Sequence, residues 1–116
     1  MAKINPKIIY DKEEDIFYLS KNRPSIASIE IGDFILDIDS QGFVSAIEII
    51  NAKDNLGIES NLLEKVEKAS MSVIYKPDYM FVILFIKLPD KEKEIRIPLT
   101  VSLGHKKIEK EDFVFA

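Results

Sequence analysis

The 116-residue chain has no cysteine and only one histidine. The lack of cysteine excludes disulfides, thiolate metal sites and cysteine nucleophiles, and it fits a reducing compartment. His105 follows Gly104 in a polar stretch, and its spacing suggests no nucleophilic partner. We therefore expect His105 to be a surface residue rather than a base. The four glycines are isolated, which excludes a glycine-rich phosphate-binding loop.

Long hydrophobic runs are also absent. The longest apolar run covers residues 79–86, far short of the roughly 20 residues that a membrane-spanning helix needs. The start, MAKINPK, has no apolar signal region. We expect a cytoplasmic protein with no membrane segment.

Basic residues are not in excess, and the net charge is −4. Nucleic-acid binding usually requires a basic patch, because neutralising phosphates supplies much of the affinity. The one dense basic triplet, residues 105–107, is closely followed by Glu109, Glu111 and Asp112. A nucleic-acid partner is therefore disfavoured. Glutamine occurs once, among many lysines and glutamates, a pattern typical of proteins from hot environments.

The pattern of turns and β-prone runs predicts a mainly antiparallel fold. Charged, glycine or proline turns separate runs expected to be strands at residues 7–10, 16–19, 25–31, 34–39, 43–50, 71–76, 79–88, 94–101 and 113–115. Pro98 places the penultimate strand at a sheet edge or at a bulge. One helix is expected over residues 61–68, after Ser60 as N-cap.

These elements predict an α+β fold, with one helix between two groups of strands. The length fits a single domain over residues 1–116. It divides into a hairpin-rich half at 7–55, a helical segment at 56–69 and a C-terminal β half at 70–116.

The predicted strand at residues 79–88 is apolar on both faces, whereas a sheet with one solvated face alternates polar and apolar residues. A single short helix cannot cover the spare face, so we predict a homodimer. The expected interface consists of Met80, Val82, Leu84 and Ile86. Closure of the strands into a sandwich or barrel explains the same pattern without a partner.

The acidic stretch DIDSQGFVSAIE, residues 37–48, departs from a calcium-binding EF-hand loop only at Gln41. Its flanks alternate with period two, which indicates strands rather than the two helices that such a loop needs. We interpret it as an acidic β-hairpin with Gly42 in the turn. Weak Ca²⁺ or Mg²⁺ binding at Asp37 and Asp39 is the alternative, and no other cofactor is expected.

The segments YDKEEDIFYL and ILDIDSQGFVSAIEIINA carry a resemblance. Together they resemble the prokaryotic domain-of-unknown-function family 2283, over about residues 7–55. The matching positions are Tyr10, Asp11, Asp15, Tyr18, Asp37, Asp39, Gly42, Ile47, Glu48, Ile49, Asn51 and Ala52. Lys53 departs from the serine usual in the family. The resemblance implies a small β-rich domain and no activity.

The motif carboxylates raise the question of catalysis. If the two hairpins pack side by side, Asp11, Asp15, Asp37, Asp39 and Glu48 converge, as in a divalent-cation-dependent hydrolase. Turns also favour Asp for local backbone hydrogen bonds, so a non-catalytic role is the preferred interpretation.

We predict a non-catalytic protein-interaction or regulatory module that acts as a homodimer with an unknown protein partner. The alternatives are the hydrolase and a small apolar ligand binder, whose cavity the two-faced strands would line.

Overall fold

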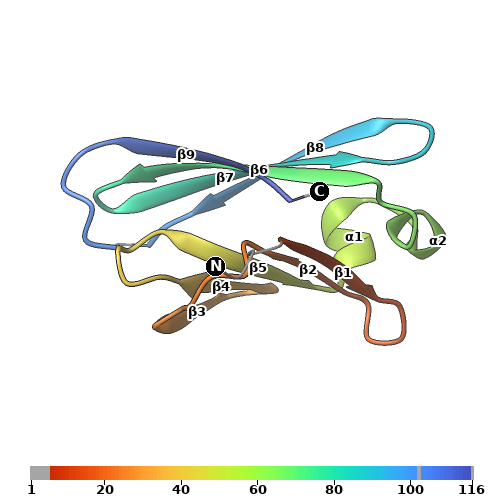
Figure 1. Cartoon of the computed structure of the whole chain (residues 1–116), viewed down its shortest axis with the longest axis horizontal. Coiled ribbons are helices and arrows are strands. Elements are labelled where there is room, and N and C mark those ends of the chain that lie inside the picture. The colour runs from red at the N-terminus through yellow and green to blue at the C-terminus, as the bar shows by residue number, and fades with distance from the viewer. Residues whose placement is uncertain (1–5, 102, 116) are drawn as a thin grey trace, which may run out of the picture.

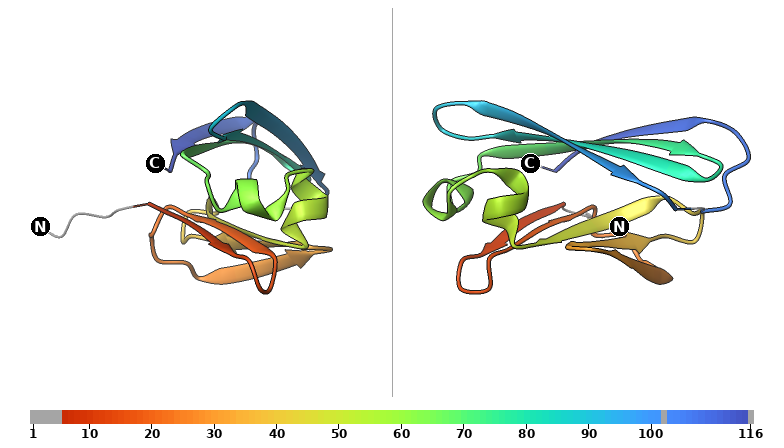
Figure 2. Two further views of the ribbon diagram at one scale, coloured as in Figure 1. Left: turned by 90° about the vertical axis from the view of Figure 1, so that its right-hand side faces the viewer. Right: turned by 180° about the vertical axis from the view of Figure 1, so that it is seen from behind.

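The computed structural model describes residues 6–101 and 103–115. They form two antiparallel sheets that face each other, with two short helices at one end of the pair (Figures 1 and 2). The predicted α+β fold, with helical residues between two groups of strands, is confirmed. No helix in the described part of the chain is long and apolar enough to cross a membrane.

The N-terminal sheet has the strand order β1-β2-β5-β4-β3. Its strands are β1 (Lys7–Asp11), β2 (Ile16–Ser20), β3 (Ala27–Ile31), β4 (Phe34–Ile38) and β5 (Val44–Ile50). The C-terminal sheet has the order β8-β7-β6-β9. Its strands are β6 (Lys68–Lys76), β7 (Tyr79–Lys87), β8 (Glu92–Leu99) and β9 (Glu109–Val114). Strand β8, which contains Pro98, lies at an edge as predicted, because proline cannot donate to a central ladder.

The helical segment differs from the prediction. Instead of one helix over 61–68, the chain forms α1 (Ala52–Leu56) and α2 (Ser60–Leu63). Gly57, with φ of 64°, ends α1. After a turn at residues 64–65, the last residue of the predicted helix joins the sheet, because Lys68 pairs with Lys87 at the start of β6. A short isolated helix is only marginally stable, whereas a nine-residue strand pair gains a full ladder of hydrogen bonds.

The last strand also differs, since β9 begins at Glu109 rather than at residue 113. Its first four residues are charged and carry no apolar alternation. Pairing with β6 from Tyr75 to Ser70 nevertheless holds them in the sheet. Tertiary pairing thus overrides a low local β-propensity.

The predicted dimer interface is wrong in its residues. Met80, Val82, Leu84 and Ile86 are each no more than 1% exposed, and they belong to the core between the two sheets. The N-terminal sheet covers this face of β7 within one chain. The pattern therefore arises from closure into a sandwich, the alternative that the sequence left open.

We expect Leu84→Ala to lower the free energy of unfolding by about 2–5 kcal/mol, because it removes a fully buried side chain from the core. Chemical denaturation measures the loss. The matched control is Ile108→Ala, at a side chain that is 68% exposed, and it should change stability by less than about 0.5 kcal/mol. Val82→Glu should prevent folding. A folded but merely dissociated Val82→Glu protein would contradict the core assignment.

Candidate functional site

The turn between β4 and β5 is an acidic hairpin, as predicted. The Asp39 carboxylate accepts hydrogen bonds from the backbone N–H groups of Gln41 and Phe43, at 2.9 and 3.0 Å. The Gly42 N–H donates to the carbonyl of Asp39 at 3.1 Å, and Gly42 has a φ of 85°. A Cβ at this position would lie 3.2 Å from the carbonyl oxygen of Leu103. Positive φ and close approach together favour glycine here.

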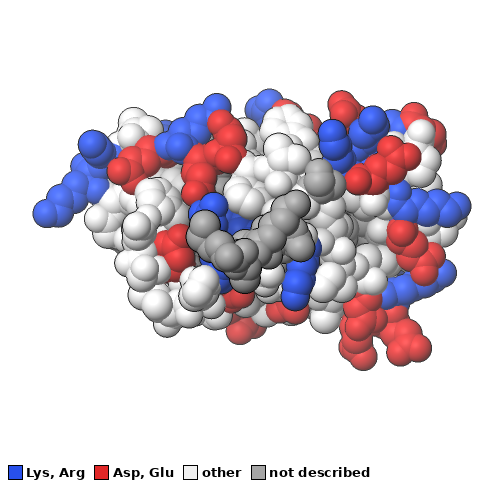
Figure 3. Space-filling model, viewed as in Figure 1, with Lys and Arg blue, Asp and Glu red and all other residues white. Residues whose placement is uncertain are grey.

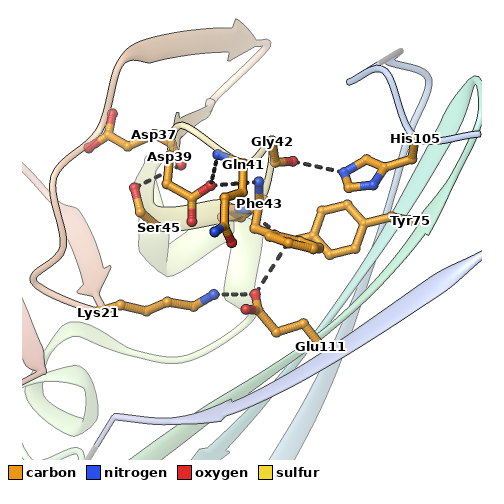
Figure 4. Close-up of polar contacts among 11 residues, drawn as sticks. Lys21, Asp37, Asp39, Gln41, Gly42, Phe43, Ser45, Tyr75, His105 and Glu111 are labelled. Atoms are coloured by element: carbon orange, nitrogen blue, oxygen red, sulfur yellow. Dashed lines mark hydrogen bonds and ion pairs between the residues drawn. The ribbon is translucent and has the colours of Figure 1, made fainter.

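The two aspartates proposed as metal ligands serve different parts of the hairpin (Figure 4). Asp39 satisfies the turn, whereas the Asp37 carboxylate accepts a hydrogen bond from the Ser28 hydroxyl on the neighbouring strand at 2.7 Å. Across residues 6–101 and 103–115, no group of three His, Asp or Glu side chains is placed to hold a metal ion. The five motif carboxylates are not gathered at one point, because Asp15 and Asp39 accept hydrogen bonds from backbone N–H groups in two separate corners of the sheet.

One part of the motif ties the β1–β2 hairpin to α1. The Tyr10 hydroxyl donates to the Asp15 carboxylate at 2.8 Å. The same carboxylate accepts from the Lys53 backbone N–H at 3.1 and 3.3 Å, and the Asp15 carbonyl accepts from the Ala52 N–H at 3.0 Å. The two ends of the motif thus meet in space. We call these contacts between the β1–β2 hairpin and α1 the hairpin lock. Lys53 contributes only its backbone N–H to it, so having lysine where the family usually has serine removes no side-chain contact.

Asn51 shapes the same corner. It precedes α1 with a φ of 52°, a left-handed conformation that asparagine tolerates better than most residues. Asn55 holds the corner from within α1, since its side-chain amide donates to Asp33 at 2.9 Å and to the Ile50 carbonyl at 2.7 Å. Asn51 is therefore a turn residue with a structural role.

Four other motif residues gather on the outer face of the N-terminal sheet, whereas the motif's Ile47, Ile49 and Ala52 are buried in the core. Asp11, Tyr18, Asp37 and Glu48 come from four different strands. With Ile9 and Ile16, they line a shallow hollow of about 440 Å³, termed here the motif hollow. Sheet order brings them together, because β1, β2, β5 and β4 are successive neighbours.

Glu48 is the unusual member of the motif hollow. It lies on the central strand of the sheet, and its cross-strand neighbours are Tyr18 and Ile35. The described residues give its carboxylate no hydrogen bond or ion pair. The five ion pairs found within residues 6–101 and 103–115 all lie elsewhere. A negative charge without a counter-charge therefore sits in a partly apolar setting.

A polar cluster that pattern reasoning missed joins the two sheets at the end opposite the helices. The Lys21 side chain is completely buried and forms an ion pair with Glu111 of β9. The Tyr75 hydroxyl accepts a hydrogen bond from the Val44 N–H at 2.8 Å, and it lies 3.4 Å from Glu111 (Figure 4). No local signal marks Lys21, because its partner is 90 residues away.

His105 belongs to this cluster and is not the surface residue that the sequence predicted. Its side chain is only 7% exposed. Nδ1 lies 2.7 Å from a Glu109 oxygen, and Nε2 lies 2.9 Å from the Gly42 carbonyl oxygen. The ring also contacts those of Phe43 and Tyr75. The polar connection before β9 folds onto the β4–β5 hairpin, and this long-range contact buries the histidine.

We expect Lys21→Met to destabilise the protein by about 3 kcal/mol, because it leaves the carboxylate of Glu111 in the sandwich without its partner. The double variant Lys21→Met/Glu111→Leu should recover most of that loss, since it removes both charges. Urea denaturation of both variants tests this. A double variant no more stable than the single one would contradict this expectation.

Burial raises the pKa of the Tyr75 hydroxyl well above its ordinary value of 10.0, and the negative charge of Glu111 adds to the effect. The folded protein therefore holds this proton more tightly than the unfolded chain. The corresponding stability is fully present below pH of about 10 and is lost as the pH rises further.

We expect Tyr75→Phe to cost about 1 kcal/mol at neutral pH, because the Val44 N–H loses its acceptor. Above pH of about 10 the wild type should lose stability faster than the variant, so the difference between them should shrink. Denaturation curves between pH 7 and 11 measure this difference. A constant difference over the whole range would contradict it.

Comparison with known proteins finds a match for the N-terminal sheet but not for the C-terminal sheet. Residues 7–53 match the family model described as Protein of unknown function (DUF2283). The matched range begins with β1, includes β5 and ends within α1. The resemblance drawn from the motif is thereby confirmed. No curated protein and no solved structure matches the chain.

Proposed function

We propose that this protein is a non-catalytic interaction or regulatory module that acts as a homodimer through the outer face of its C-terminal sheet. The carrying observation is the apolar character of that face. Phe85 is 44% exposed and Val114 is 59% exposed. The other apolar residues of the face are Ile74, Tyr79, Phe81 and Ile83.

The face needs a cover for a physical reason. The inner side of β7 is already buried, and an antiparallel sheet with one solvated face should be polar on its outer side. Instead, three consecutive outward positions of β7 carry Phe81, Ile83 and Phe85. Acidic and basic side chains are mixed along this sheet (Figure 3), which is typical of the rim of an interface rather than of its core.

Charge complementarity favours one orientation of the second copy. Strand pairing aligns Asp112, Ser72, Ile83 and Arg96 in one row across the sheet. A two-fold axis parallel to the strands would stack β9 over β8 of the partner, so that Asp112 faces Arg96 of the partner subunit. An axis perpendicular to the strands would oppose like charges. Closed dimers with an isologous interface are the commonest oligomers.

The same orientation matches shape. Small side chains on β6, Ser70 and Ser72, lie beside the large Phe85 and Ile83 of β7. A hollow of about 180 Å³ opens beside Ser70 and Phe85. The parallel two-fold axis would place Phe85 of the partner subunit over this hollow. With strands about 4.8 Å apart and a rise of about 3.3 Å per residue, the face measures about 20 by 30 Å, enough for a small specific interface.

Within one chain these charges have only weak partners. Arg96 pairs with Glu94 at 3.0 Å and Asp112 pairs with Lys110 at 3.8 Å, all exposed. Exposed pairs contribute about 0–1 kcal/mol, so exchanging them for contacts across an interface costs little.

Charge reversal tests the proposal. We expect the wild type to be a dimer. Arg96→Glu or Asp112→Lys alone should weaken dimerisation at least about tenfold, because each variant places two pairs of like charges opposite each other across the two-fold interface. The double variant Arg96→Glu/Asp112→Lys should dimerise again. Native mass spectrometry over a concentration series measures the dissociation constants. Lys91→Glu, in the turn between β7 and β8, is the matched control and should remain dimeric.

Two results would overturn the proposal in different ways. If the wild type is still monomeric at about 100 μM, a concentration well above the dissociation constant of a specific dimer, the homodimer proposal is wrong. A dimer that neither single reversal weakens would place the interface on another face of the molecule.

A further inference from the structure

We propose that the motif hollow, lined by Ile9, Asp11, Ile16, Tyr18, Asp37 and Glu48, docks an extended basic segment of a partner protein with Lys or Arg at every second position. The hollow lies on the outer face of the N-terminal sheet, and the proposed dimer contact lies on the opposite face of the sandwich. The inference therefore goes beyond the proposed dimer and does not rest on it.

The charge of the chain is divided unequally between its two parts. Residues 1–57 contain ten acidic and six basic side chains, whereas residues 58–116 contain ten of each. The net charge of −4 therefore comes entirely from the part that builds the N-terminal sheet. Among the described residues, Figure 3 shows acidic side chains gathered over the β1–β2 turn. Such a field attracts a cationic partner and repels nucleic acid.

Glu48 gives an observation that is independent of the overall charge. Its carboxylate is half-buried on the central strand between Tyr18 and Ile35, without a partner among the described residues. A cation that approaches this carboxylate gains the attraction of the opposite charge without having to break an existing ion pair. The Nζ of lysine or the guanidinium of arginine supplies that charge and the hydrogen-bond donors.

The apolar part of the hollow accounts for the rest of the ligand. Ile9 is 48% exposed although it is a large hydrophobic residue. Ile16 and Tyr18 extend this surface on the neighbouring strand. The stems of lysine and arginine pack on such surfaces, and their charged groups lie favourably over a tyrosine ring. Alternate side chains of an extended segment face the same way, so a segment with Lys or Arg at every second position directs all of them toward the hollow. Their stems would use its apolar part and their charged groups its carboxylates.

The spacing of the acids excludes a compact ligand. Asp11 is on β1 and Asp37 is on β4, three strands away in the sheet order. At about 4.8 Å per strand, their backbones lie about 14 Å apart or more. A single ion cannot bridge them, whereas an extended peptide of five or more residues can, at about 3.3 Å each.

The probe is an amidated decapeptide of alternating Lys and Ser, titrated into the ¹⁵N-labelled protein. We expect shift changes in β1, β2 and β5, and affinity that falls in 0.5 M salt. Glu48→Gln should weaken binding about tenfold, since it removes the unpaired charge and keeps the shape. Asp90→Asn, in the β7–β8 turn, changes the net charge equally and should leave the affinity unchanged. An alternating Glu and Ser decapeptide should not bind.

Thermal unfolding separates binding from stability. Glu48→Gln should melt no lower than the wild type, because no contact among the described residues depends on its charge. Equal losses in Glu48→Gln and Asp90→Asn, or shift changes confined to the C-terminal sheet, would overturn the inference. Binding of spermidine without the peptide would overturn the choice of a protein partner. Native mass spectrometry of the same samples reports the oligomeric state, so failure of the dimer is recognised separately.

Discussion

Burial of the inner face of β7 against the N-terminal sheet is the interaction on which the rest of the structure depends. Met80, Val82, Leu84 and Ile86 fill the space between the sheets, and the inward residues of β2, β4 and β5 meet them from the other side. Close-packed contacts of this kind supply most of the stability of a small domain. Because these contacts use the inner faces of both sheets, only the outer faces are available for binding other molecules.

The two outer faces differ in kind. The C-terminal sheet presents an apolar stripe with charges of both signs, which suits a second copy of itself. The N-terminal sheet presents a shallow acidic hollow with an unpaired glutamate, which suits a partner of opposite charge. A homodimer built on the first face would expose two copies of the second, pointing away from each other. Such a bivalent module gains affinity for a repeated or dimeric partner without new contacts.

The family motif divides into two sets of residues with separate roles. Tyr10, Asp15 and Asn51 hold the β1–β2 hairpin against the start of α1, and Asp39 and Gly42 build the β4–β5 turn. These contacts are local or close a corner of the sheet. Asp11, Tyr18 and Glu48 instead point outward, where their side chains make few contacts with the fold. A purely structural motif does not explain this second set, which is the reason to assign it to binding.

The sequence by itself determined the approximate positions of the strands, the acidic hairpin and the two-faced character of β7, because period-two alternation and turn chemistry are local properties. The sequence also located the motif, although it did not distinguish the motif residues that hold the hairpin against α1 from those that line the motif hollow. Only the tertiary structure decided that Met80 to Ile86 face a second sheet rather than a second subunit, since both arrangements require the same pattern. It likewise decided the burial of Lys21 and His105, and the drawing of Lys68 into β6. Their partners lie between 19 and 90 residues away or across the two sheets, and no local periodicity records a contact over that distance.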